Sequence, residues 1–118
     1  MPQRPRYLFS AAMDVAPERE TLFNQVYDTE HVPRLKQVPG VLSVARFKRV
    51  ELTMILGGER KRVVVEAEPS YNALYELESP EVLVSDAWAK AVDGGQWPGE
   101  VRPYTRNRRH VLYQRLLA

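Results

Sequence analysis

The chain has 118 residues, a length that suits one domain and buries enough surface to fold without a disulfide or a structural metal. It contains no cysteine, which excludes thiol catalysis, cysteine-ligated zinc and iron–sulfur clusters. Its 17 lysines and arginines exceed its 15 aspartates and glutamates by only two, which argues against a nucleic-acid-binding domain.

The first residues do not resemble a targeting signal. A basic start precedes a short apolar stretch that Asp14 interrupts, whereas a secretory signal peptide has a continuous apolar region. No apolar run approaches the length that is needed to cross a membrane. We therefore predict a cytoplasmic protein with neither a membrane nor a nucleic acid as a partner.

The first predicted elements are a strand and a helix. Residues 6–15 carry apolar side chains at odd and even positions, which is typical of a strand with at least one well-covered face. Pro17 suits the first turn of a helix, and Leu22 and Val26 recur at helical spacing. The pattern predicts a helix over residues 17–32.

A long hairpin is predicted next. A period of two favours one long strand over residues 41–56. Gly57 and Gly58 then turn the chain back, so that residues 51–68 form a β-hairpin insertion. The basic residues beside these glycines fit a solvated hairpin tip better than a nucleic-acid site.

A third strand and a second helix follow the hairpin. Residues 70–77 alternate again and predict a strand. Ser79 and Pro80 supply a cap and a first turn for a helix over residues 80–92, which Ser85 can restart halfway. A loop rich in glycine and proline comes after this helix.

The last predicted strand covers residues 105–117 and completes the order strand, helix, strand, strand, helix, strand. This is the order of the ferredoxin-like α+β fold, βαββαβ, in which a four-stranded antiparallel sheet carries two helices on one face. We treat residues 1–118 as a single domain. Because the strands also place apolar residues on the other face, we expect a second copy of the chain to cover it, forming a homodimer with a barrel between the sheets.

The end of the first predicted helix carries titratable groups. On a helical wheel, Glu30 falls between Val26 and Phe23, within the apolar stripe. A carboxylate there needs a partner, because burial of an unpaired charge is costly. Arg34 and Tyr27 lie within helical reach of it.

Pro33 is expected to end or bend this helix. It has no N–H for the carbonyl of Thr29, which leaves an open carbonyl and room beside Glu30 and His31. A carboxylate and an imidazole in such a pocket can transfer protons. Alternatively, Glu30 pairs with Arg34 and His31 is a half-exposed residue near the helix end.

Two segments resemble a known group of proteins. Residues 23–47, FNQVYDTEHVPRLKQVPGVLSVARF, resemble the first helix and second strand of the EthD-like families of dimeric α/β barrels. The matching features are the element His31-Val32-Pro33 and the proline–glycine turn that follows it. Residues 71–88 resemble the third strand and second helix of the same proteins.

This resemblance implies a function class. The superfamily includes cofactor-free monooxygenases, polyketide cyclases, lactone isomerases, haem-degrading enzymes and members without an assigned activity. Their shared feature is a pocket between the sheet and the first helix, often with a histidine that acts as a base or a donor. The resemblance gives this role to His31, with Glu30 and Tyr27 as neighbours. The long hairpin at 51–68 departs from the family pattern.

Several other residues have more than one interpretation. Tyr71 and Tyr75 share a strand face and suit an aromatic pocket, the core or a dimer interface. Trp97 suits a lid or a dimer contact. The basic run 106–109 suits a clamp for an anionic ligand, and His110 suits a haem ligand or a simple hydrogen-bonded residue. The candidate substrate-binding residues are Phe23, Tyr71, Tyr75 and Arg34.

Three functions follow from this pattern. The first is a cofactor-free enzyme in which His31, oriented by Glu30 or Tyr27, moves a proton on a small apolar or aromatic molecule. The second is a protein that binds a small molecule in the same pocket without chemistry, and the third is an oligomeric scaffold. With two histidines and no cysteine we predict no metal and no cofactor.

Overall fold

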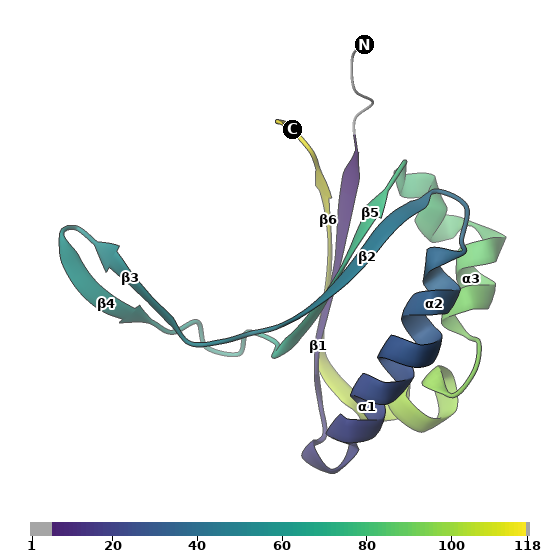
Figure 1. Cartoon of the computed structure of the whole chain (residues 1–118), viewed down its shortest axis with the longest axis horizontal. Coiled ribbons are helices and arrows are strands. Elements are labelled where there is room, and N and C mark those ends of the chain that lie inside the picture. Colours follow the sequence, from purple (N-terminus) through teal and green to yellow (C-terminus); the bar gives the residue numbers. More distant parts are fainter. Residues whose placement is uncertain (1–5, 118) are drawn as a thin grey trace.

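The structure is a computed structural model that describes residues 6–117. Four strands form one antiparallel sheet in the order β2-β5-β1-β6. All the helices lie on one face of this sheet (Figure 1). This arrangement confirms the predicted ferredoxin-like α+β fold. The strands are β1 (Tyr7–Val15), β2 (Val41–Lys48), β5 (Tyr71–Leu77) and β6 (Thr105–Gln114).

The first helical segment continues past Pro33, so of the two expected outcomes, an end or a bend, the end is wrong. It begins with a 3-10 turn, η1 (Pro17–Arg19), and continues as α1 (Glu20–Val26), a π-helical turn, η2 (Tyr27–His31), and α2 (Val32–Lys36). In the π turn, the N–H of Val32 donates to the carbonyl of Tyr27, five residues earlier. A π turn inserts one extra residue into the helix, which relieves the clash of the proline ring with the preceding turn.

The second helical segment is split at Ser85. A 3-10 turn, η3 (Pro80–Val84), precedes α3 (Asp86–Val92). The side chain of Ser85 caps α3, because its Oγ accepts from the N–H of Trp88 at 3.1 Å, whereas Ser79 makes no such bond. The chain then forms a second π turn, η4 (Trp97–Val101), and a 3-10 turn, η5 (Arg102–Tyr104).

A separate two-stranded hairpin, which we call the arm, projects away from the helices (Figure 1). Its strands are β3 (Leu52–Leu56) and β4 (Glu59–Val63), within the predicted insertion. Gly57 and Gly58 turn the chain with φ of 60° and 82°, which suits a tight hairpin turn. The single strand predicted over residues 41–56 is therefore divided between two sheets, since β2 ends at Lys48.

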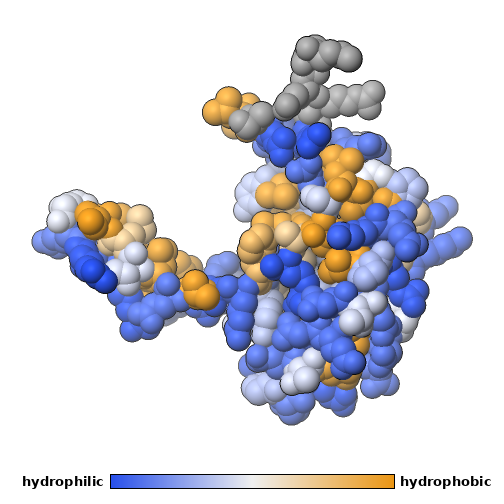
Figure 2. Space-filling view, in the orientation of Figure 1, coloured by the Kyte–Doolittle hydropathy of each residue, from blue (hydrophilic) through white to orange (hydrophobic). Residues whose placement is uncertain are grey.

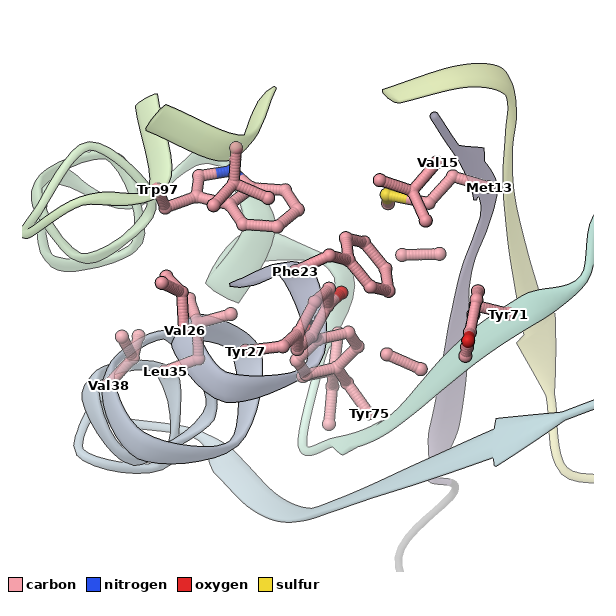
Figure 3. Close-up of a cluster of buried hydrophobic side chains, with 14 of the residues drawn as sticks. Met13, Val15, Phe23, Val26, Tyr27, Leu35, Val38, Tyr71, Tyr75 and Trp97 are labelled. Atoms are coloured by element: carbon pink, nitrogen blue, oxygen red, sulfur yellow. Dashed lines mark hydrogen bonds between the residues drawn. The ribbon is translucent and has the colours of Figure 1, made fainter. Parts of the chain in front are cut away.

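The hydrophobic core lies between the sheet and the helices. Figure 3 shows Phe23 and Tyr27 of the first helical segment among side chains from β1 and β5. The largest fully buried side chains are Tyr75, Phe23, Leu35, Leu77, Val26 and Val101. Within residues 6–117, no helix is both long enough and apolar enough to cross a membrane.

The other face of the sheet carries no helix (Figure 1). By strand register, it presents Leu8, Phe47, Val111 and Tyr113, whose exposed fractions are 37%, 54%, 41% and 54%. Figure 2 shows apolar surface along one side of the arm and on the adjoining part of the domain. This open face is the surface expected to meet a second copy.

Candidate functional site

A cavity of about 370 Å³ lies between the helical layer and the sheet. Most of its walls are aromatic or aliphatic, and its polar lining groups come from tyrosine, histidine and arginine. This composition is typical of a small-molecule site. The lining residues are Phe9, Ala11, Tyr27, His31, Leu35, Tyr75, Leu83, Trp88, Val92, Trp97, Arg102, Arg108 and His110.

His31 lies in the wall of this cavity with 5% of its surface exposed. Its ring stacks on Trp97, with centroids 4.3 Å apart and planes 20° apart, and meets the edge of Tyr27 at 5.0 Å. Among the described residues, its Nδ1 is the one buried side-chain nitrogen or oxygen without a hydrogen-bond partner. Buried polar atoms are normally paired, so this nitrogen calls for an explanation in the site's function.

The environment keeps the His31 imidazole neutral. Burial lowers its pKa to about 4, and the positive charges of Arg102, Arg34 and Arg46 act in the same direction. At pH 7 the ring therefore has one nitrogen that can accept a proton and one that can donate a hydrogen bond.

Two tyrosines stand beside His31. The hydroxyls of Tyr27 and Tyr75 are 3.3 Å apart, and both side chains line the cavity. Burial raises the pKa of Tyr27 and raises that of Tyr75 well above its usual value. Both hydroxyls thus stay protonated at pH 7. Because one of them donates to the other, the pair has one O–H left for an oxygen of a ligand.

Glu30 is not in the apolar stripe, and that prediction was wrong. The π turn under-winds the helix, so His31 faces the interior while Glu30 faces the loop before Trp97. Its carboxylate accepts from the backbone N–H of Gln96 at 3.0 Å and from Gln96 Nε2 at 2.5 Å. These bonds lower the pKa of Glu30, and Arg34 adds a smaller effect in the same direction.

Glu30 therefore reaches His31 indirectly. It holds Gln96, the next residue is Trp97, and the Trp97 ring stacks on the imidazole. Arg34 lies beside the same loop, against Gly94 and Gly95. Glu30 and Arg34 are thus positioning residues of the loop, and neither lines the cavity.

The other candidate residues divide between cavity and core. Tyr75 lines the cavity, as proposed for a substrate-binding residue. Phe23 is fully buried between Tyr71 and Trp97, at centroid distances of 5.0 and 6.2 Å (Figure 3). Tyr71 accepts from Asn24 Nδ2 at 3.3 Å on the far side of Phe23 from Trp97, so Phe23 and Tyr71 belong to the core.

Sequence reasoning missed part of the aromatic wall. Phe9 packs against Tyr75, Trp88 and His110 at centroid distances of 5.6, 5.9 and 5.7 Å. The alternation of β1 places Phe9 on the helix face with Ala11, which is a signal that the sequence does contain. No helical or strand periodicity in the sequence indicates which way Trp97 faces, because its position depends on the conformation of the loop at 93–96.

The sequence leaves His110 as either a haem ligand or a simple hydrogen-bonded residue. His110 lies on β6 opposite Ala11, stacks on Phe9 with planes 17° apart, and lines the cavity. The described residues contain no cluster of three or more histidine, aspartate or glutamate side chains that could hold a metal ion.

Solved structures share this architecture. A protein predicted to be an antibiotic biosynthesis monooxygenase, from Bordetella bronchiseptica, is 18% identical, with a TM-score of 0.63 over 98% of this chain and 100% of its own. The haem degrader MhuD from Mycobacterium tuberculosis, solved with two haems in its active site, is 14% identical, with a TM-score of 0.61 over 95% and 97%. An EthD family protein from Bacillus halodurans is 12% identical, with a TM-score of 0.57 over 93% and 99%.

The chain has their ferredoxin-like fold. The predicted fold is thus confirmed, and at identities this low the likeness extends to the fold alone. No family model matches the chain, and no curated protein matches it in sequence.

We predict that Gly95→Ala disturbs the support of Trp97. Gly95 has a φ of 65°, and an added Cβ would collide with Glu30 Oε1 and lie 3.1 Å from Arg34 Nη2. The expected cost is roughly 1–3 kcal/mol in the free energy of unfolding, measured by denaturation with tryptophan fluorescence. Gly99→Ala is the control, because a Cβ there meets nothing within 4 Å. Equal stability of the two variants would contradict this packing.

We also predict that His31 makes the protein less stable as the pH falls. Between pH 6.5 and about 4 the unfolded chain binds a proton at this residue and the folded protein does not. The free energy of unfolding should therefore drop across this window, by on the order of 3 kcal/mol in total. His31→Phe should remove this part of the pH dependence in urea denaturation. Parallel stability curves for the two proteins would show that His31 titrates normally.

Proposed function

We propose that this protein is a cofactor-free enzyme that transfers a proton on a small apolar or aromatic molecule bound in the cavity. The observation that carries the proposal is a neutral, buried histidine in the wall of that cavity, with the hydroxyls of Tyr27 and Tyr75 beside it. A ligand in the cavity would exchange its proton with the part of the imidazole that faces it, since Nδ1 is fully enclosed.

The residues have separate roles in this proposal. His31 is the group that accepts or donates the proton. Tyr27 and Tyr75 form a hydrogen-bonded pair of neutral hydroxyls, 3.3 Å apart, and the O–H that this pair leaves free donates to a ligand oxygen on which negative charge develops. Trp97 and Glu30 position the imidazole. Trp97 stacks on the ring of His31, and Glu30 binds the loop that carries Trp97.

The second candidate is a binding protein without chemistry. The low pKa of His31, about 4, favours it, because a general base works best with a pKa near the working pH. The two candidates differ in one result: a binding protein releases its ligand chemically unchanged.

Proton transfer can be tested without knowledge of the complete reaction. The protein is mixed in D₂O with 2-tetralone, an aromatic ketone, and with a butenolide lactone, and loss of the acidic C–H signals is followed by NMR. We expect catalysed exchange that slows by about 100-fold or more in His31→Phe. Exchange at the uncatalysed rate, together with saturable binding of the ketone, would favour the binding protein.

His110→Phe is the matched variant for this experiment, because His110 is the other histidine of the cavity. Exchange that is lost in His110→Phe and kept in His31→Phe would contradict the assignment of His31. Both variants are first compared by thermal unfolding, so that a failure to fold is not counted as a loss of catalysis.

We also propose that two copies of the chain pair through their open sheet faces. The supporting observation is the exposure of large apolar side chains, Leu8, Phe47, Val111 and Tyr113, on the face without helices. Apolar residues gathered in this way commonly mark an interface between proteins, and twofold dimers are the most frequent oligomers.

If two copies pair through their open sheet faces, a charged side chain introduced on this face should weaken the dimer. Val111→Asp should shift the protein from dimer to monomer in light scattering, because the carboxylate would be buried at the interface without a partner. Val84→Asp is the matched control, since Val84 is 82% exposed in η3, on the helical side. A monomeric wild type, or equal effects of both substitutions, would refute pairing through this face.

A further inference from the structure

The charged side chains of the cavity lining are all basic. Among residues 6–117, Arg102 and Arg108 line it, and no aspartate or glutamate does. Since His31 is neutral at pH 7, nothing in the lining offsets these two charges. Aromatic and aliphatic walls screen charge less than water does, so the cavity favours a negative ligand.

Arg102 is held in a fixed position. Its Nη2 donates to the carbonyl of Val92 at 3.0 Å and to Asp93 Oδ1 at 2.8 Å. A guanidinium has five N–H donors, so these two bonds leave others for a ligand. Asp93 offsets part of its charge, but the Asp93 side chain is 65% exposed and lies outside the lining.

Arg108 has no such partner. It lies on β6, and within the described part of the chain it forms no ion pair. Its neighbour Arg109 points to the opposite face, where it bonds Glu68 at 3.2 Å and pairs in register with Ala12. Of the basic run 106–109, Arg108 alone contributes to the cavity, as one uncompensated positive charge.

We propose that the cavity binds an aromatic carboxylate, with its ring among the aromatic walls and its carboxylate at Arg102 and Arg108. This rests on the proposed function, since it names the ligand class of the same site. One uncompensated charge suits a monoanion. A cavity of about 370 Å³ lies within the range of roughly 300–1,000 Å³ that is usual for small-molecule sites, which suits a two-ring acid.

A bound carboxylate would also act on His31. Arg102 is one of the charges that lower the pKa of this imidazole. Burial is the larger cause of the low pKa of His31 and stays in place, so a negative group beside Arg102 offsets only the contribution of that arginine. To that extent the bound ligand makes the histidine a better base.

The test compares 2-naphthoate with 2-naphthamide, a neutral molecule of nearly the same shape, by titration calorimetry on the full chain. We expect the naphthoate to bind about tenfold more tightly or better, and this preference to shrink by a similar factor in Arg108→Gln. Arg109→Gln is the matched control and should keep the preference, because the two arginines are adjacent on opposite faces. Arg108 is exposed, and a thermal melt verifies that its variant folds.

Each outcome decides one of the claims. Equal affinities for the two probes, or equal effects of both arginine substitutions, would overturn the carboxylate site and leave the proposed function in place. Binding of neither probe would overturn the cavity as an aromatic ligand site altogether. Exchange of the neutral ketone in D₂O is measured separately, so that failure of the proposed proton transfer is recognised independently.

Discussion

One backbone hydrogen bond determines which side chains of the first helical segment reach the interior. The N–H of Val32 donates to the carbonyl of Tyr27, five residues back. This wider turn accepts Pro33 without breaking the helix, and it rotates the residues that follow. His31 turns inward and Glu30 turns outward as a result. The cavity wall, the neutral imidazole and the support of Trp97 all depend on this rotation.

The rotation explains which parts could be predicted from the sequence. The alternation in β1 and β5, the Gly57-Gly58 turn and the order of elements were enough for the fold, because each is a local pattern with one simple solution. Glu30 was misplaced because a wheel with 3.6 residues per turn assumes regular winding. Pro33 indicated that the helix is irregular. It did not indicate which irregularity forms, because a helix break and a π turn can both accommodate a residue without an N–H.

The positions of other site residues could not be predicted for a different reason. Trp97, which the sequence left as a lid or a dimer contact, and Arg102 come from a loop and turns after α3, where no period indicates which side chains face inward. Their positions depend on contacts over long sequence distance, such as Glu30 with Gln96 and Arg102 with Val92. By contrast, Phe9 and Arg108 lie on strands, and once the sheet register is known their faces follow from alternation.

The arm has a consequence for how this protein meets other chains. A two-stranded ribbon leaves the outer edge of each strand unpaired. On β4 that edge runs through Glu59, Arg60, Lys61 and Arg62, whose charges discourage an approaching strand, whereas β3 is Leu-Thr-Met-Ile-Leu and carries none. The two edges of the arm therefore differ: charged side chains oppose the addition of a further strand at β4, and β3 has no charged side chain to oppose it.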